Sequence, residues 1–287
     1  MNAKIDQKTS IFLCAICNIE SGTCNEDCKF CTQSVKYKAD IQRYKQKQIE
    51  QIVQEAKRAR ENNANGFCLV TAGKGLTDKR LKFVCEAAKA VKKENLGLIL
   101  IACNGTASVE QLQALKEAGV DAYNHNLETA QDFYPTIVTT HSWEERYQTC
   151  KNVKEVGLRL VCGGIFGLGE TQEQRISMLK SIASLEPMNV PLNFFIPNKA
   201  LPIEASDIKR EEAFELISLA RKMIPNAKKI MVAGGRELMF GEEQYKIFEK
   251  GANAFVIGDY LTTQGKSPKD DIAELEKLGF KIKRERD

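Results

Sequence analysis

Short runs that are hydrophobic at every position alternate along the chain with longer stretches whose apolar residues recur at helical spacing. Residues 98–101 and 254–257 are apolar throughout, as is typical of parallel strands buried on both faces. Alternation of strand and helix predicts a parallel sheet. We expect eight strands, at residues 11–20, 66–72, 97–103, 121–127, 158–165, 190–196, 229–234 and 254–259.

The helix ends carry recognisable capping residues. In a capping box, a side chain at the helix start and another three residues later satisfy free backbone N–H groups. Three segments have this pattern: Ser108-x-x-Gln111, Ser142-x-x-Glu145 and Thr171-x-x-Gln174. Proline at a first helical position marks a further start, at Ser267-Pro268. Glycines that suit helix ends stand at Gly119, Gly157, Gly251 and Gly279.

Eight strand–helix units favour a closed (βα)8 barrel over an open doubly wound sheet. No G-x-G-x-x-G joins the first strand to a helix, which argues against a Rossmann fold. We predict an α/β fold of the TIM-barrel type, a single domain over residues 1–287, with roughly the first ten and last eight residues peripheral. Active sites of such barrels lie at the carboxyl ends of the strands, where cysteines, asparagines and other polar residues gather in this sequence.

Composition mainly excludes classes of partner. The formal charge is +4, and Lys and Arg are interleaved with Glu, so no basic stripe indicates nucleic-acid binding. No apolar run approaches the roughly 20 residues that span a bilayer, and the first residues lack the apolar stretch of a signal peptide. We therefore expect a cytoplasmic protein without a membrane or nucleic-acid partner.

Ten cysteines and only two histidines are present. Because the cytoplasm is reducing, so many cysteines are better explained by metal or redox chemistry than by disulfides. Sulfur should therefore be the main metal ligand.

Three of these cysteines, Cys24, Cys28 and Cys31, have the spacing C-x3-C-x2-C. Three thiolates can bind three irons of a [4Fe–4S] cluster and leave the fourth iron open, whereas ferredoxin-type carriers supply four cysteines. The open iron can chelate S-adenosylmethionine (SAM), whose reductive cleavage gives a 5′-deoxyadenosyl radical. Zinc is the alternative, but no second cysteine or histidine pair at matching spacing completes a tetrahedron. We predict a radical-generating cluster at this loop.

Further segments carry a resemblance to a known family. The Cys24–Cys31 segment resembles the motif of the radical SAM superfamily. Segments that resemble biotin synthases follow in collinear order at residues 123–129 (YNHNLET), 163–171 (GGIFGLGET), 233–237 (AGGRE) and 259–263 (DYLTT). The resemblance implies a sulfurtransferase that inserts sulfur into dethiobiotin to form biotin. It also implies a flavodoxin or ferredoxin reductant and a homodimer.

The matching positions imply roles for individual residues. Arg146 would pair with the methionine carboxylate of SAM, because a guanidinium matches a carboxylate with two parallel bonds. Further SAM contacts implied by the resemblance are Phe30, Thr71, Asn126, Glu128, Ile165 and Ile196. Substrate contacts implied in the same way are Asn124, Asn126, Asn193 and Thr262. Each asparagine could instead satisfy buried backbone at a strand end.

The auxiliary cluster site departs from the family pattern. That family ligates a [2Fe–2S] cluster with three cysteines and an arginine. Cys68 matches the first cysteine, whereas Cys103 lies two residues and Cys162 one residue after the expected positions, and Met231 replaces the arginine. A shift of two residues keeps the side-chain direction in a strand, whereas a shift of one reverses it unless a bulge intervenes.

Two extra cysteines on the first strand, Cys14 and Cys17, are additional candidates. We therefore expect a thiolate-ligated auxiliary cluster, [2Fe–2S] or of another type, with Cys68, Cys103 and Cys162 as its main ligands. Cysteine is also a common core residue, which is the alternative for each of them. Cys85 and Cys150 lie on apolar helix faces and are predicted to be core.

Two other functions stay open at this point. Another barrel-type radical SAM enzyme, such as one that matures a metallocofactor, would share the fold and the first cluster. A non-catalytic iron–sulfur carrier would need neither Arg146 nor the glycine-rich fifth strand.

Overall fold

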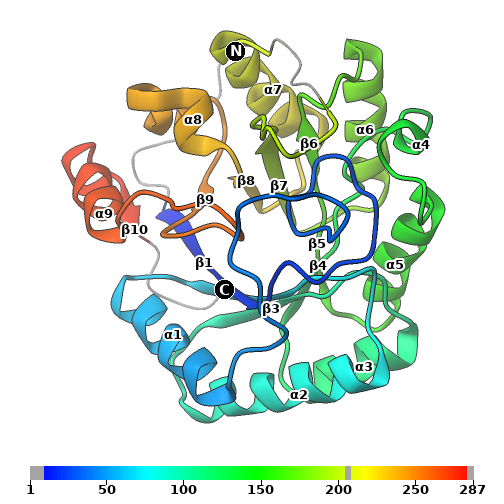
Figure 1. The fold of residues 1–287 in the computed structure, drawn as a ribbon. Coiled ribbons are helices and arrows are strands. Elements are labelled where there is room, and N and C mark those ends of the chain that lie inside the picture. The colour runs from blue at the N-terminus through cyan, green and yellow to red at the C-terminus, as the bar shows by residue number, and fades with distance from the viewer. Residues whose placement is uncertain (1–9, 204–207, 283–287) are drawn as a thin grey trace.

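The chain folds into a closed parallel barrel surrounded by helices (Figure 1). The computed structural model describes residues 10–203 and 208–282. The segments expected to be peripheral at the two ends lie mostly outside these residues. The strands are β1 (Ser10–Glu20), β2 (Gly66–Thr71), β3 (Ile99–Cys103), β4 (Ala122–Asn124), β5 (Arg159–Val161), β6 (Gly164–Phe166), β7 (Asn189–Phe194), β8 (Lys229–Val232), β9 (Ala254–Val256) and β10 (Lys281–Ile282).

The strand order follows the chain from β1 through β5 and then β7, β8 and β9, and β9 pairs with β1 to close the ring. The predicted barrel is thus confirmed, and the pairings between these strands are all parallel. The strand expected at 158–165 is divided, because β5 and β6 each pair with β7 on either side of Gly163. A Cβ at Gly163 would lie 1.7 Å from the carbonyl oxygen of Pro191, so only glycine fits there. Short β10 extends the sheet beside β1.

The helices cover the outside of the barrel. They are α1 (Ile49–Glu61), α2 (Asp78–Lys93), α3 (Val109–Glu117), α4 (Tyr134–Ile137), α5 (Trp143–Glu155), α6 (Gln172–Ser184), α7 (Arg210–Met223), α8 (Arg236–Phe240), the 3-10 helix η1 (Gly241–Phe248) and α9 (Pro268–Lys277). The capping boxes predicted for α3, α5 and α6 are all formed. Within the described residues, no helix is long and apolar enough to cross a bilayer.

Two separate apolar layers follow from the alternation of side chains along the strands. Leu13, Cys17 and Ile19 of β1 point outward and pack into a large core beneath the helices. Phe12 and Cys14 point inward, into a smaller cluster inside the barrel that we call the inner cluster. Its buried members are Phe12, Cys14, Cys68, Val70, Ile99, Ile101, Ala122, Val161, Met231, Ala233, Ala254 and Val256. Strand side chains that point inward can therefore reach the barrel mouth, whereas those that point outward cannot.

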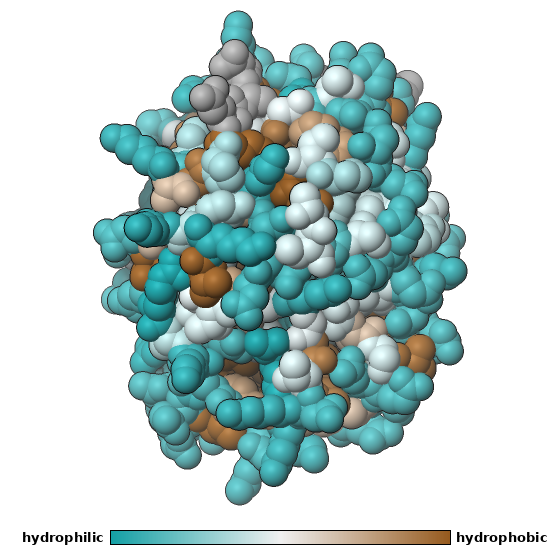
Figure 2. Space-filling model, turned by 45° about the vertical axis from the view of Figure 1, so that its right-hand side comes forward, coloured by the Kyte–Doolittle hydropathy of each residue, from teal (hydrophilic) through white to brown (hydrophobic). Residues whose placement is uncertain are grey.

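The outer surface is that of an ordinary globular protein. The face drawn in Figure 2 is mostly hydrophilic, with small separate apolar patches. Large exposed apolar side chains among the described residues include Val35 and Leu238. Scattered residues of this kind need no special explanation.

Candidate functional site

The three-cysteine loop follows β1 and folds back on itself over the barrel mouth. The N–H of Cys24 donates to the Gln33 carbonyl at 3.2 Å, and that of Val35 donates back to the Cys24 carbonyl at 2.8 Å. The N–H of Cys31 donates to the Cys28 carbonyl at 3.0 Å. These bonds hold Cys24, Cys28 and Cys31 within one compact loop.

The loop offers three free thiols near one another. Burial raises the pKa of Cys31 to about 11, backbone N–H groups oppose the rise, and negative charge on Cys24 adds to it. Burial likewise raises the pKa of Cys28, with a further rise from charge on Cys31 and Cys24. Neutral thiols of this kind must lose protons to bind iron, so loading releases protons. No three His, Cys, Asp or Glu side chains of the described segments are gathered as a single-ion site.

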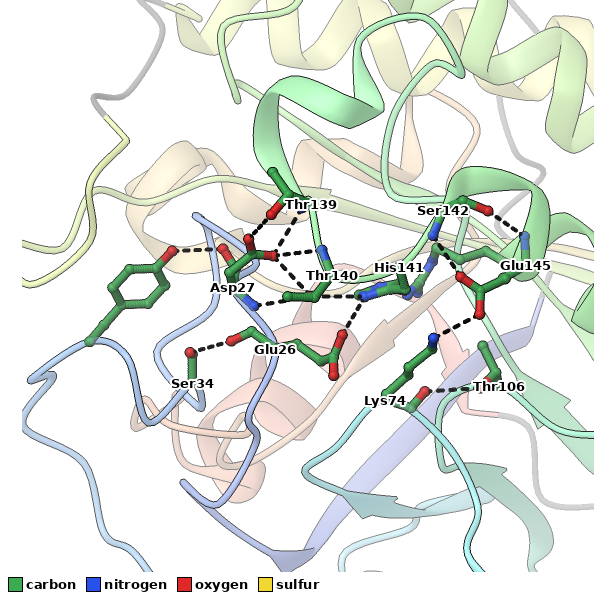
Figure 3. A network of polar contacts seen from close by, with 12 residues as sticks. Glu26, Asp27, Ser34, Lys74, Thr106, Thr139, Thr140, His141, Ser142 and Glu145 are labelled. Carbon is green, nitrogen blue, oxygen red and sulfur yellow. Dashed lines mark hydrogen bonds and ion pairs between the residues drawn. The ribbon is translucent and has the colours of Figure 1, made fainter.

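A polar network fastens this loop to the segment before α5 (Figure 3). The carboxylate of Asp27 accepts hydrogen bonds from both the N–H and the hydroxyl of Thr139 and of Thr140. Glu26 contacts Nδ1 of His141 at 2.7 Å. Burial lowers the pKa of His141, with a further lowering from Arg146, so the ring is neutral and its Nδ1–H donates to Glu26. The loop and α5 are therefore one unit.

Arg146, in the first turns of α5, is the cation of the mouth. Its Nε donates to the carbonyl oxygen of Asn126 at 2.6 Å, and its Nη2 donates to Oε1 of Glu128 at 2.8 Å. Nη1 lies 3.4 Å from Nε2 of His141, the ring nitrogen that carries no proton. Burial would lower the pKa of Arg146, but the negative Glu128 holds it above its ordinary value. Arg146 is thus a fixed charge facing the cysteine loop.

Glu128 has a strained backbone conformation and a carboxylate oxygen without a hydrogen-bond partner. Its φ is +69°, a left-handed conformation that a residue with a long side chain rarely adopts. Its backbone carbonyl accepts from the N–H of Ile165 at 2.7 Å, which fixes it against β6. Oε2 is buried without a hydrogen-bond partner in the structure. A buried carboxylate oxygen held in strained geometry is suited to accept from a ligand hydroxyl.

The asparagines predicted as substrate contacts divide into two kinds. Asn126 accepts from the Gly163 N–H at 3.1 Å, and Asn193 bridges the Gly164 carbonyl and the Gly234 N–H at 3.1 and 2.9 Å. Both amides therefore satisfy buried backbone, the alternative that the sequence left open. Asn124 is different, because its Oδ1 is buried without a partner.

The connection from β9 to α9 lies beside the cysteine loop. The hydroxyls of Thr262 and Thr32 are 2.9 Å apart, and Asn18 donates from Nδ2 to the Leu261 carbonyl at 2.9 Å. Oδ1 of Asn18 is also buried without a partner. Residues expected at the mouth for SAM include Phe30, Ile165 and Ile196, which are partly buried, and Thr71, which is buried and accepts from Asn104 at 3.1 Å.

Three of the five candidate auxiliary cysteines point into the barrel. Cys14 and Cys68 belong to the inner cluster, and Cys103 packs against it. They stand on three consecutive strands, and a hydrogen bond with the Cys103 thiol, together with burial, raises the pKa of Cys68. Burial raises the pKa of Cys14 to about 12. Met231 faces the same interior. Three cysteine thiols and one methionine thioether, all soft sulfur donors, therefore face the barrel interior.

The structure does not bring Cys17 and Cys162 to this interior. Both pack in the outer core beneath the helices. The thiol of Cys162 lies 3.8 Å from that of Cys150, which in turn donates to the carbonyl of His125 at 3.2 Å. β5 runs regularly up to Val161, so the one-residue shift reverses the direction of Cys162 and no bulge restores it. Cys150 is core, as predicted.

The chain matches models of known protein families. Residues 19–182 match the family model described as the Radical SAM superfamily, and residues 191–281 match the Biotin and Thiamin Synthesis associated domain. The chain is 66% identical to the biotin synthase of Aliarcobacter butzleri over 272 residues, 95% of this chain and 96% of that protein. The chain belongs to the biotin synthase family. The biotin synthase of a Nitratiruptor species is 63% identical over 95% of this chain and 97% of that protein.

Solved structures support the fold of this biotin synthase family member. Methylornithine synthase superposes with a TM-score of 0.81 at 20% identity, over 96% of this chain and 84% of that one. An FeFe-hydrogenase maturase from Carboxydothermus hydrogenoformans has the same TM-score at 19% identity, over 94% of this chain and 67% of that one. At these identities the likeness concerns the barrel alone.

Several residues at the mouth are not predicted by the sequence patterns. Asn18 is an inward-facing polar residue near the end of β1, and the alternation along that strand could have pointed to it. Glu26 and Asp27 lie inside the cysteine motif, but their partners are more than a hundred positions away in the chain. No local pattern signals such a contact.

Proposed function

We propose that this chain forms biotin from dethiobiotin by radical sulfur insertion, the reaction that the resemblance in the sequence implies and that agrees with the name biotin synthase of its relatives. The observation that carries the proposal is the presence of three groups of residues at the mouth and in the interior of one barrel. The thiols of the Cys24–Cys31 loop lie at the mouth, the Arg146–Glu128 pair lies beside them, and inward-facing cysteines lie below. This order suits an enzyme that generates a radical above its substrate and holds a sulfur source beneath it.

The residues at the mouth fit a [4Fe–4S] cluster with SAM. Cys24, Cys28 and Cys31 would hold three irons, and the cluster with SAM would supply the 5′-deoxyadenosyl radical. Arg146 would bind the methionine carboxylate with the guanidinium N–H groups that face the loop. The unused Oε2 of Glu128 would accept from a SAM hydroxyl. The remaining SAM contacts would be Phe30, Thr71, Asn126, Ile165 and Ile196.

Substrate recognition would rest mainly on Asn124 and Thr262. The ureido ring of dethiobiotin is rigid and presents N–H donors and a carbonyl acceptor. The buried, unpartnered Oδ1 of Asn124 suits an N–H of such a ring, because leaving it unpaired costs free energy. Asn126 and Asn193 would shape the site through the backbone that they hold.

The auxiliary cluster would be ligated by Cys14, Cys68 and Cys103, which share the barrel interior. This set replaces the one expected from sequence, because Cys17 and Cys162 face the helices. The cluster would be [2Fe–2S], as in the resembling family, or of another type, since Met231 supplies a thioether where an arginine is expected. It would be the source of the inserted sulfur.

The remaining parts of the proposal concern the setting of the enzyme. We propose a flavodoxin or ferredoxin reductant, a homodimer, a single domain over the whole chain and a cytoplasmic location. Their support is the resemblance noted in the sequence together with the family membership.

One anaerobic experiment tests the activity. The reconstituted protein is mixed with dithionite, SAM and dethiobiotin, and 5′-deoxyadenosine and biotin are measured. Both products are expected. Deoxyadenosine without biotin would indicate a radical enzyme with another substrate, and neither product would indicate an iron–sulfur carrier. An Arg146→Met variant serves as the negative control for SAM cleavage, because it removes the positive charge and leaves the three cysteines in place.

A further inference from the structure

A cavity of about 800 Å³ opens at the seam where the first and last strands of the barrel meet. Its walls come from β1, from α1 and the segment before it, and from the connection between β9 and α9. Ile16 and Tyr260 line it, and both also pack against the inner cluster. Ala15 and Ala59, from the outer side of the barrel wall, line it as well. The cavity thus reaches from the helix layer to Ile16 and Tyr260, which border the inner cluster.

The lengths of the two strands explain the opening. β1 has 11 residues and β9 has three, and their pairing ends at Cys14↔Val256. One further backbone bond, from the N–H of Ile257 to the Cys14 carbonyl, closes the ladder. The chain then turns away at Gly258, whose φ is +72°. Above Cys14, none of the described strands pairs with the β9 side of β1.

The opening meets the interior at the level of the auxiliary cysteines. Ile16 is the register partner of Cys68, and Cys14 is one inward-facing position below Ile16. Ile16 is only partly buried although its inward-facing neighbour Cys14 is buried, which agrees with a cavity at that point. A small molecule in the cavity is therefore separated from the Cys68 layer by the Ile16 side chain.

The outer rim carries more positive than negative charge. Lys47, Arg58 and Lys266 line the cavity against the carboxylates of Glu55 and Asp259. Lys47 is paired with Glu55 at 2.6 Å, and Arg58 is exposed on α1. An exposed guanidinium at the rim favours a small anion at the entrance.

We propose that this cavity is a lateral entry through which a small sulfur-bearing anion of the hydrosulfide class reaches the auxiliary site. The inference rests on the proposed function, in which every product molecule carries away one sulfur atom that has to be replaced. The barrel mouth is the place of SAM and substrate in that proposal. Thr262 borders the cavity, so its upper end adjoins the proposed substrate site, but no residue of the Cys24–Cys31 loop lines it. A side opening at the level of Cys68 therefore allows the interior site to be resupplied without passing the cluster and SAM at the mouth. No bond is formed or broken in the passage itself.

The entry is tested first in full-length protein freed of iron and sulfide. The small neutral reagent methyl methanethiosulfonate is added, and mass spectrometry of peptides follows labelling of Cys68 and of Cys31 at the mouth. Ala15→Phe places a large side chain in the cavity, so it is expected to slow the labelling of Cys68 about tenfold and to leave the labelling rate of Cys31 unchanged. Equal labelling of Cys68 in both proteins would overturn the proposal. Thermal melts verify that the variant is folded.

A second test uses charge at the rim and does not depend on packing. Cys24, Cys28 and Cys31 are replaced by alanine so that only the interior site loads, and uptake of radiolabelled sulfide with ferrous iron is timed. Arg58→Glu is expected to slow uptake about threefold. Arg60→Glu on the same helix does not line the cavity and is the matched control. Equal uptake rates for both variants and their parent would contradict the proposed entry alone. A parent that retains no iron and sulfide would instead contradict the proposed auxiliary cluster.

Discussion

The guanidinium of Arg146 donates to Oε1 of Glu128 at 2.8 Å, and this buried contact joins α5 to the loop after β4. Both side chains are largely shielded from solvent, with 12% and 13% of their surfaces exposed. Glu128 keeps its left-handed backbone within this pair. Because the same guanidinium also donates to the Asn126 carbonyl and approaches His141, one residue joins three parts of the mouth.

Replacing Arg146 by lysine should weaken SAM binding more than it weakens the fold. Lysine keeps the positive charge but lacks the fork that holds Glu128 and the Asn126 carbonyl together with a carboxylate ligand. We expect the SAM dissociation constant to rise at least about 30-fold, consistent with the roughly 2–5 kcal/mol lost when one partner of a buried charge pair is truncated. Equilibrium dialysis of the reconstituted protein measures it. Arg210→Lys, in an exposed pair with Glu243, is the control and should have no effect.

The directions of the cysteine side chains lead to a second prediction. Alanine at Cys14, Cys68 or Cys103 should remove the auxiliary cluster and leave the cluster at the mouth. Alanine at Cys17 or Cys162 should leave both clusters, because these thiols lie in the outer core. Iron and sulfide analysis with Mössbauer spectra distinguishes the two groups. Loss of the auxiliary cluster in Cys162→Ala, with Cys103→Ala unaffected, would contradict the ligand set that the structure supports.

The same cysteines show how far the sequence could predict the site. Strand positions, the barrel and the capping boxes follow from local periodicity, so they were predictable to within a few residues. The inward direction of Cys103 follows from its two-residue shift along a regular strand. The direction of Cys162 depended on whether the chain bulges beside Gly163-Gly164. The approach of Pro191 to Gly163 leaves Cys162 before the break and facing outward.

Other parts of the site depend on contacts between distant segments. Glu26 and His141 are 115 positions apart, and the strained conformation of Glu128 depends on its bond to Ile165. The seam cavity arises from the difference in length between β1 and β9. The strand expected at 254–259 ends at Val256, which is the difference that opens the wall. Tertiary packing determines all of these features.

A buried ion pair near the seam should control the connection that carries Thr262. Arg236 donates to both carboxylate oxygens of Asp271, at 3.0 and 2.8 Å, and both residues are fully buried. Arg236 also contacts Glu237, which accepts from the hydroxyl of Tyr260 at 2.8 Å. The pair therefore joins α8 to α9, and Glu237 of α8 holds Tyr260 in the segment between β9 and α9.

We expect Asp271→Asn to lower the free energy of unfolding by about 3 kcal/mol, because it removes the fully buried counter-ion of Arg236 and leaves only the partly exposed Glu237. We also expect a higher KM for dethiobiotin with a smaller change in kcat, since the change affects positioning. Chemical denaturation and steady-state assays measure the two effects. Asp270→Asn, at the exposed neighbouring position, is the control. A KM equal to that of the parent would show that the connection does not depend on this pair.

Asp27 makes the anchoring of the cysteine loop sensitive to acid. Burial alone would raise the pKa of Asp27, but hydrogen bonds from Thr139 and Thr140 hold it well below its ordinary value of 3.8 (Figure 3). A carboxyl group whose pKa is depressed in the folded state stabilises that state above its ordinary pKa. That contribution is lost as the pH falls below 3.8 toward the lower folded pKa.

In the metal-free protein, the amide hydrogens of Thr139 and Thr140 should therefore be protected from exchange at neutral pH and lose protection in acid. Asp27→Asn should lose that protection already at neutral pH, because an amide oxygen is a weaker acceptor than a carboxylate. Hydrogen–deuterium exchange of the peptide around these threonines, compared between parent and variant at each pH, measures the difference. Asp40→Asn, at an exposed position, should behave like the parent. If Asp27→Asn kept full protection at neutral pH, the carboxylate would not be what fastens the cysteine loop to the segment before α5.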